Sequence, residues 1–206
     1  MPERAAQLVE GGLTGETGRA CHAADVQRTH RWRSAPGRSF SSMSALDDID
    51  LTTLRGEATR FGAYSDKVVL VVNVASRCGL APQYEKLEQL QRTYGERGFT
   101  VVGFPSNQFL QELGSSEAID EYCSATWGVT FPMMEKVRVN GKSEHPLYTE
   151  LKKTPDAAGK AGKVKWNFEK FVVTPGGQVH RFRPTTEPDD PAIVAVIEGA
   201  LPAVTE

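Results

Sequence analysis

The sequence predicts an α/β fold in which helices cover both faces of a central mixed β-sheet. Aliphatic runs of strand length alternate with amphipathic segments of helical period through the middle of the chain. Two further strand-like segments, joined by a turn at Pro175, and a last helix close the chain. Alternating strands and helices followed by a hairpin favour a sheet with both parallel and antiparallel pairs. The length of 206 residues suits one domain with a sizeable core.

Residues 1–43 differ from the rest of the chain and are predicted to be a disordered N-terminal extension. They are rich in Gly, Ser and Arg, and no hydrophobic period is sustained in them. Their four acidic residues argue against a transit peptide, and no apolar region marks a secretory signal. Met43 is an alternative start of the chain. The regular pattern begins at Ser44, so the folded domain is predicted to span residues 44–206.

The first half of the domain is predicted to contain a hairpin, a strand, a helix and a second strand. Residues 47–64 alternate weakly around an Arg-Gly turn, which indicates a short hairpin. Val68–Val74 is aliphatic at six of its seven positions, as is typical of a strand buried on both faces. Pro82–Arg97 has Pro at its first turn and apolar residues on one face, and Gly98 follows as a helix stop. Phe99–Phe104 is the second buried strand.

The second half is predicted to hold three helices, one single strand and the closing hairpin. A hydroxyl or carboxylate just before a helix accepts hydrogen bonds from the free N–H groups of the first turn. Ser115 or Ser116 is therefore predicted to cap the first of these helices, and the pair Asp189-Asp190 to cap the last. In chain order, the remaining predicted elements are a strand at Met133–Val139, a helix at Pro146–Lys153, hairpin strands at Trp166–Thr174 and Gln178–Arg183, and a helix at Pro191–Leu201.

Composition and charge argue against several classes of function. The formal net charge of −2 gives no electrostatic reason to expect nucleic acid or an anionic membrane as a partner. No apolar run approaches the length that spans a bilayer, so stable membrane insertion is not expected. Three cysteines are few and odd in number, which favours a reducing compartment, the cytoplasm, over a secreted disulfide scaffold. No histidine pairs with a cysteine at zinc-ligand spacing, so no metal is expected.

Cys78 is the residue that most constrains function, because it lies at the junction between the first central strand and the following helix. A thiol at such a junction is near the positive end of a helix dipole, and Arg77 is its neighbour. Both influences favour the thiolate, the reactive form of cysteine. Cysteine is more often a small buried apolar residue, but the position outside the strand favours a reactive thiol. Ala81 stands where a Cys-x-x-Cys motif would have its second cysteine, which excludes that kind of oxidoreductase.

Three separated motifs resemble the signature blocks of the glutathione peroxidase family, in order and at similar spacing. They are the runs Asn73-Val-Ala-Ser-Arg-Cys-Gly, Gly103-Phe-Pro-Ser-Asn-Gln-Phe-Leu-Gln-Glu-Leu-Gly and Lys165-Trp-Asn-Phe-Glu-Lys-Phe. The resemblance extends from about Ile49 to Leu201. A cysteine after the first long central strand is also where thioredoxin-like proteins place theirs, so the resemblance implies a thioredoxin-like fold.

The family resemblance implies a cysteine-type thiol peroxidase that needs no cofactor. In this family a thiolate attacks the O–O bond of hydrogen peroxide or of an organic or lipid hydroperoxide, giving a sulfenic acid and water or an alcohol. By this resemblance Cys78 is the nucleophile, and Gln111, Trp166 and Asn167 supply N–H donors. The family usually has one more residue before this glutamine and a proline where Leu113 stands. Gln108 is therefore an alternative to Gln111.

Members of this family differ in how they reduce the sulfenic acid back to the thiol. Thioredoxin-dependent members use a second cysteine on the helix after the glutamine loop. Cys123 lies on the corresponding predicted helix, one position before the usual resolving cysteine, where Ser124 stands. Cys123 is thus the resolving candidate, and a buried structural cysteine is the alternative interpretation.

The expected reductant is thioredoxin, because no arginine cluster can be assigned to glutathione. Glutathione as the reductant, a peroxide-sensing relay to a protein partner, and a binding module with an inactive site are the alternatives. The loop between Leu151 and Lys165 is short, which resembles the monomeric or dimeric members of the family.

Overall fold

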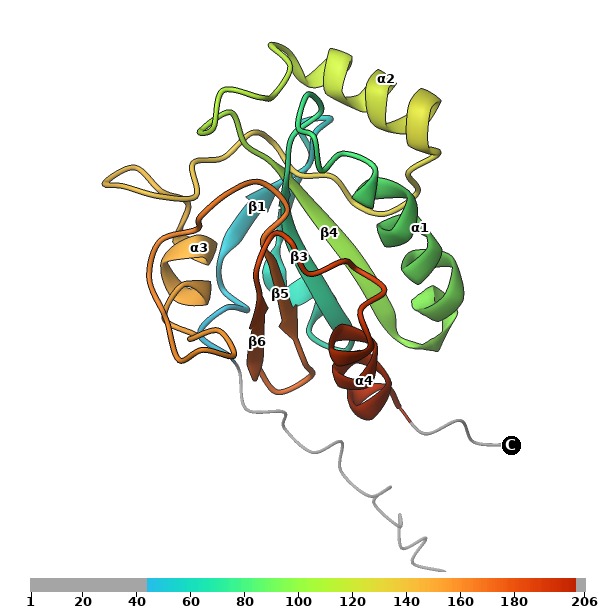
Figure 1. The fold of residues 1–206 in the computed structure, drawn as a ribbon, viewed down its shortest axis with the longest axis vertical. Helices are drawn as coiled ribbons and strands as arrows, with labels where there is room; N and C mark the ends of the chain where they lie inside the picture. The colour runs from blue at the N-terminus through green and yellow to red at the C-terminus, as the bar shows by residue number, and fades with distance from the viewer. Residues whose placement is uncertain (1–43, 203–206) are drawn as a thin grey trace, which may run out of the picture. The chain divides into compact units, whose positions relative to one another are not determined.

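The computed structural model describes residues 44–202, and these residues contain a four-stranded mixed sheet (Figure 1). The predicted N-terminal extension, residues 1–43, lies outside the described residues. The strand order is β4-β3-β5-β6, in which β3 pairs in parallel with β4 and antiparallel with β5, and β5 pairs antiparallel with β6. The strands span Val68–Val74 for β3, Phe99–Pro105 for β4, Lys170–Val173 for β5 and Val179–Phe182 for β6.

Helices cover both faces of this sheet, as the sequence predicts. Figure 1 shows α1 and α4 on one side and α3 on the other. Alternate residues of β3 enter two separate hydrophobic cores: Leu70 and Val72 pack with α1, α2 and α4, whereas Val69 and Val71 pack with α3. The helices span Gln83–Tyr94 for α1, Ser116–Trp127 for α2, Pro146–Leu151 for α3 and Pro191–Ala200 for α4.

The predicted N-terminal hairpin is present and lies outside the main sheet. It consists of β1 (Asp50–Thr52) and β2 (Ala58–Arg60), which pair antiparallel as a separate two-stranded sheet. Two short 3-10 helices complete the elements, η1 at Phe61–Tyr64 after the hairpin and η2 at Gly95–Arg97 after α1. Gly98 then adopts a left-handed conformation with φ of 90°, which ends the helical segment as predicted.

The predicted helix caps are also in place. The Ser115 hydroxyl accepts a hydrogen bond of 3.2 Å from the Ala118 N–H, which decides between the two serine candidates. An Asp190 carboxylate oxygen accepts a hydrogen bond of 2.9 Å from the Ala192 N–H at the start of α4. Local side-chain chemistry therefore sets the first residues of α2 and α4.

The prediction of a strand at Met133–Val139 is wrong. This segment divides its backbone hydrogen bonds between two neighbours, so it forms isolated bridges and no continuous ladder. Met134 donates to the Gly103 carbonyl of β4 over 2.8 Å, whereas the Met133 carbonyl accepts from Leu54 beside the hairpin over 2.8 Å. The strand predicted from Trp166 begins instead at Lys170, because Phe168 has a φ of 64°, outside the extended region.

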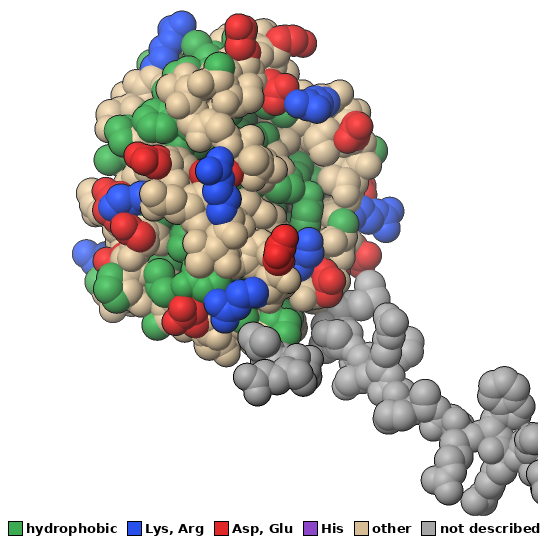
Figure 2. Space-filling view, turned by 90° about the vertical axis from the view of Figure 1, so that its right-hand side faces the viewer, with side chains coloured by type: hydrophobic (Ala, Val, Ile, Leu, Met, Phe, Trp, Pro, Cys, Tyr) green, Lys and Arg blue, Asp and Glu red, His purple; other side chains and the backbone are tan. Residues whose placement is uncertain are grey.

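Charge is mixed on the described surface. Figure 2 shows acidic and basic side chains interspersed on the face seen from the right of Figure 1. Within residues 44–202, no helix combines the length and apolar character needed to cross a membrane.

Replacing Gly103 by Ala should destabilise the domain, because a Cβ there would collide with the Met133 sulfur and lie 3.3 Å from the Phe131 ring. Overpacking of a buried site costs about 1–3 kcal/mol, so we expect that loss in the free energy of unfolding measured by urea titration. Gly199→Ala is the control, since its added Cβ meets no atom within 4 Å. In a double-mutant cycle Met133→Ala should relieve part of the loss; strict additivity would contradict the proposed collision.

Candidate active site

Cys78 lies in the turn between β3 and α1, where the sequence predicts it, and its side chain is only 5% exposed. The Leu80 N–H donates to the Cys78 sulfur over 3.4 Å, and a donor directed at sulfur stabilises negative charge on it. The Arg77 N–H donates to the Gln111 carbonyl over 2.8 Å. The turn that carries the candidate nucleophile is therefore joined directly to the glutamine loop.

The Gln111 and Asn167 side chains contact each other. Asn167 Nδ2 donates to Gln111 Oε1 over 2.9 Å, so the loop after β4 and the segment before β5 meet beside the Cys78 turn. Because the Gln111 oxygen is the acceptor here, its amide nitrogen remains free to donate to another group. The Asn167 side chain is fully buried, and its Oδ1 has no hydrogen-bond partner in the described part of the chain.

Trp166 is partly exposed beside this pair. Its ring packs against Phe109 with ring centroids 5.0 Å apart, and its relative exposure is 41%. Asn73 Nδ2 donates to the Trp166 carbonyl over 3.0 Å, which fixes the backbone of the residue to β3. The position of Trp166 is thus fixed by the hydrogen bond to its backbone and by packing against the Phe109 ring, while part of its indole remains exposed to solvent.

Gln108, the alternative to Gln111, is engaged elsewhere. Its Oε1 accepts from the N–H groups of Val139 and Asn140, each over 2.9 Å, and its Nε2 donates to the Asn140 carbonyl over 2.8 Å. These bonds anchor the loop at 139–140. The structure therefore brings Gln111, and not Gln108, into contact with Asn167.

Asn73 is a supporting residue that the sequence analysis missed. Its carbonyl accepts from the Phe168 N–H over 2.6 Å, and its Oδ1 accepts from the Glu169 N–H over 3.1 Å. Together with the bond to Trp166, these contacts clamp the Trp-Asn-Phe motif to the strand that leads to Cys78. The available signal was that Asn73 is the single polar residue in an aliphatic run.

A buried ionic network supports the same motif from the other side, and it was also missed. Glu169 accepts a bond of 2.6 Å from the Arg181 guanidinium and one of 2.7 Å from the Lys165 N–H. Lys170 Nζ donates to the Phe168 carbonyl over 2.8 Å, and burial lowers the pKa of Lys170 to about 7. Charged residues in a short strand give no sequence signal for burial, because they are usually exposed.

Glu112 is another residue that the sequence analysis did not single out. Its Oε1 accepts from the Ser76 N–H over 3.0 Å and from the Leu113 N–H over 2.7 Å. Leu113 stands where the family pattern has proline, which has no N–H to donate. In this chain the Leu113 amide therefore adds a bond that helps to hold the shortened loop against the Cys78 turn.

Cys123 lies on α2, as predicted, and is 2% exposed. Burial raises the pKa of its thiol to about 11; the Tyr84 hydroxyl opposes this shift, whereas the carboxylates of Glu112 and Asp120 add to it. Cys123 and Cys78 are both free thiols and belong to the same hydrophobic core. In this reduced state Cys123 is therefore a protonated thiol at neutral pH.

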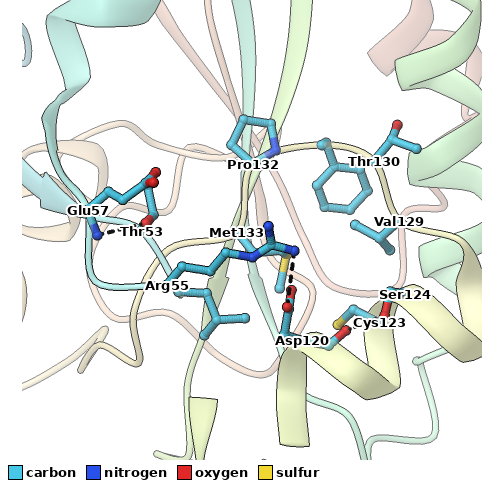
Figure 3. A pocket seen from close by; sticks show the side chains of 12 residues that line it. Thr53, Arg55, Glu57, Asp120, Cys123, Ser124, Val129, Thr130, Pro132 and Met133 are labelled. Carbon is cyan, nitrogen blue, oxygen red and sulfur yellow. Dashed lines mark hydrogen bonds and ion pairs between the residues drawn. The ribbon is translucent and has the colours of Figure 1, made fainter. Parts of the chain in front are cut away.

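A pocket of about 270 Å³ borders Cys123 (Figure 3). It is formed by α2, the hairpin turn and residues 129–133, and Cys78 is not among its lining residues. The Arg55 guanidinium reaches Asp120 of α2 over 3.2 Å, as the dashed line in Figure 3 marks. The pocket brings solvent close to the helix face that carries Cys123.

The assembled groups suit attack by a thiol on an electrophile. Cys78 is the candidate thiol, and the side chains of Gln111, Trp166 and Asn167 carry N–H groups of the kind that stabilise negative charge on an oxygen. Within residues 44–202, no group of three or more His, Cys, Asp or Glu side chains is arranged to hold a metal ion.

Comparisons with known proteins point to one family. The family model for glutathione peroxidase matches residues 46–152. The thioredoxin/glutathione peroxidase BtuE of Escherichia coli K12 is 44% identical over a 181-residue alignment that covers 76% of this chain and 99% of that protein. The glutathione peroxidase-like peroxiredoxin 2 of Saccharomyces cerevisiae is 47% identical over 68% of this chain and 88% of its own length.

A solved structure agrees with these relatives. The crystal structure of Trgpx in its apo form is 38% identical, with a TM-score of 0.59 over 76% of this chain and 97% of that one. The thioredoxin-like fold that the sequence predicts is thereby confirmed.

Alkylation of Cys123 by iodoacetamide in the native reduced protein should be slow at pH 7 and should accelerate about tenfold per pH unit towards pH 10. Only the thiolate reacts, and the pKa of this thiol is raised to about 11. Mass spectrometry of the Cys123 peptide after timed alkylation measures the rate. In urea the rate should level off near the ordinary cysteine pKa of about 8.5. A native-state rate that levels off below pH 9 would contradict the burial of this thiol.

Proposed function

Because the chain belongs to the glutathione peroxidase family and is a peroxidase that reduces hydroperoxides, we propose that Cys78 is its nucleophile and thioredoxin its reductant. The observation that carries the proposal is the contact of three separated motifs at one turn. The Gln111 carbonyl binds the Arg77 N–H over 2.8 Å, and the Gln111 side chain binds Asn167 over 2.9 Å.

In the first step, the Cys78 thiolate attacks one oxygen of the hydroperoxide and the O–O bond breaks. The sulfur keeps that oxygen as a sulfenic acid, and the other oxygen leaves as an alkoxide or hydroxide that takes up a proton. Gln111 is the most direct donor to the leaving oxygen, since Asn167 occupies its side-chain oxygen and leaves its N–H groups free. Asn167 acts in this scheme by orienting Gln111, and the Trp166 indole N–H is the second donor.

Organic hydroperoxides, including those of lipids, fit the surface beside the site. Leu110 and Trp166 are the exposed large hydrophobic side chains of the described residues, with exposures of 87% and 41%, and both neighbour the Gln111–Asn167 pair. Leu110 also has a φ of 59°, a conformation that costs free energy for a residue other than glycine. An exposed apolar residue held in this way can contact the alkyl part of a substrate.

In the second step, the Cys123 thiol attacks the sulfenic sulfur of Cys78, water leaves, and a disulfide forms that thioredoxin reduces. Two observations support this route. Cys78 and Cys123 share one hydrophobic core, and the similar Escherichia coli and yeast proteins are named for thioredoxin and for peroxiredoxin activity. Glutathione is the second candidate, because the Escherichia coli protein is named for both.

The reductant can be tested by NADPH consumption with a hydroperoxide and either the thioredoxin or the glutathione recycling system. Cys78→Ser should lower turnover in both systems to background, since the nucleophile is lost. Cys123→Ser should lower only thioredoxin-linked turnover, because a glutathione thiol can attack the sulfenic acid directly. Unchanged turnover in Cys78→Ser would refute the assignment of the nucleophile, and full thioredoxin-linked turnover in Cys123→Ser would remove the resolving role.

Gln111→Ala should slow the reaction of the reduced protein with hydrogen peroxide about 10²-fold, as expected when one donor to a developing oxyanion is removed. Gln108→Ala is the matched control. It should keep the peroxide rate but lower the free energy of unfolding by about 1–3 kcal/mol, because buried groups of the 139–140 loop lose their partners. A larger effect of Gln108→Ala than of Gln111→Ala on the peroxide rate would reverse the assignment.

A further inference from the structure

Lys170 is the one buried lysine among the described residues, and its side chain has no exposed surface. It is the first residue of β5 and lies two positions after Phe168. Its ammonium donates to three backbone carbonyls, those of Phe168 over 2.8 Å, Pro184 over 3.1 Å and Thr186 over 2.6 Å. Within residues 44–202 no carboxylate bonds it, although a buried charge is usually paired with an opposite one.

The three carbonyls match the charged form of this side chain. An ammonium carries three N–H donors and no acceptor, so three carbonyls satisfy it completely. A neutral amine has only two donors, and one carbonyl would then lose its partner. Burial disfavours the charge and lowers the pKa of Lys170 to about 7. The arrangement therefore requires a charge whose burial costs free energy.

One of the three carbonyls belongs to a strained residue of the candidate active site. Phe168 has a φ of 64°, which is costly for a residue other than glycine and persists only where neighbours enforce it. Its N–H donates to the Asn73 carbonyl over 2.6 Å, and its own carbonyl accepts from Lys170. The φ torsion lies between these two bonded groups. Because Asn167 directly precedes Phe168, this torsion decides where the Asn167 side chain lies relative to β5.

The Pro184 carbonyl connects Lys170 to the helix that follows Cys78. It accepts from Lys170 Nζ and also from Gln83 Nε2, over 3.0 Å. Gln83 is buried and is the first residue of α1, five positions after Cys78. One carbonyl thus joins β5, which follows the donor segment, to α1, which follows the candidate nucleophile.

We propose that the Lys170 ammonium is a positioning residue for hydroperoxide reduction, which holds the Asn167 side chain in place beside the Cys78 turn. This role rests on the proposed function, in which Cys78 is the nucleophile. Lys170 acts through the Phe168 carbonyl on Asn167, and Asn167 acts on Gln111 through their bond of 2.9 Å.

A double-mutant cycle tests this route on the rate constant of the reduced protein with hydrogen peroxide, measured by stopped-flow tryptophan fluorescence. Lys170→Met removes the charge and all three bonds but keeps most of the side-chain volume. At about pH 6 it should slow the reaction about tenfold, because a donor is displaced. In an Asn167→Ala background it should change the rate less than about twofold, since its effect passes through Asn167. Lys163→Met, at an exposed lysine of the preceding loop, is the control and should match the parent.

The pH dependence is a readout that a merely structural role would not change. The ammonium is present below its pKa of about 7 and lost above it. The ratio of the parental rate to the Lys170→Met rate should therefore fall towards one between about pH 6 and pH 9. Stability should change in the opposite direction. The unfolded lysine has a pKa of about 10.4 and binds more protons above pH 7, so the parent gains free energy of unfolding relative to Lys170→Met as the pH rises.

Two surface variants keep Lys170 and do not depend on whether Lys170→Met folds. The carboxylates of Glu187 and Glu169 both oppose the effect of burial on the pKa of Lys170. Glu169 is buried and bonded to Arg181 of β6 and to Arg183, whereas Glu187 lies at the surface, 3.4 Å from Lys86 of α1.

Glu187→Gln should lower the pKa of Lys170 further. Its peroxide rate should then drop to about one half of the parental rate near pH 7 and match it at about pH 5.5 and pH 9. Asp189→Asn, at the other carboxylate paired with Lys86, is the matched control and should follow the parent throughout.

The contrary outcomes are distinct. Full additivity of Lys170→Met and Asn167→Ala, or a ratio of parental to Lys170→Met rates that does not change with pH, would make Lys170 a structural brace and overturn the proposal. A parental profile in Glu187→Gln would do the same. A Cys78→Ser variant that still reacts with hydrogen peroxide would refute the proposed function itself, and this role with it.

Discussion

The Asn73 side chain is the constraint on which the rest of the site depends. It lies on β3, five residues before Cys78, and bonds the Trp166 carbonyl over 3.0 Å and the Glu169 N–H over 3.1 Å. The Asn73 side-chain amide makes these hydrogen bonds in place of strand pairing, because Phe168 is not in the extended conformation. The strand that leads to Cys78 and the segment that carries Trp166 and Asn167 are thereby fixed to each other, and Asn167 in turn bonds Gln111.

Buried charged side chains make this arrangement rigid, and their burial costs free energy. Glu169 and Arg181 are an ion pair with no exposed side-chain surface, and such pairs often contribute little net stability because both charges lose their hydration. Here these charged residues fix the backbone geometry. Glu169 also accepts a hydrogen bond from the Lys165 N–H, and Lys170 donates one to the Phe168 carbonyl. Removing one partner would leave a buried charge uncompensated, so the position of the Trp166–Phe168 segment depends on the intact network.

Features that depend on the local sequence pattern could be predicted from the sequence, whereas features that depend on tertiary contacts could not. The aliphatic run of β3, a serine cap at the start of α2 and the position of Cys78 follow from short-range chemistry, and the structure has them. The strand predicted at Met133–Val139 fails, because two different neighbours compete for its hydrogen bonds. Likewise, the distinction between Gln108 and Gln111 and the burial of Glu112 arise from contacts across the fold that no local pattern encodes.

The two cysteines of the domain occupy contrasting environments, and the roles proposed for them follow from this contrast. Cys78 has a backbone donor and adjoins the Gln111 loop, whereas Cys123 is a buried thiol with its pKa raised to about 11. The most direct test is to treat Cys123→Ser with one equivalent of hydroperoxide in the presence of dimedone, which traps sulfenic acids, and to locate the adduct by mass spectrometry. We expect one adduct, on Cys78. Consumption of the peroxide without an adduct on Cys78, or with the adduct on Cys21, would contradict the assignment of Cys78 as the nucleophile.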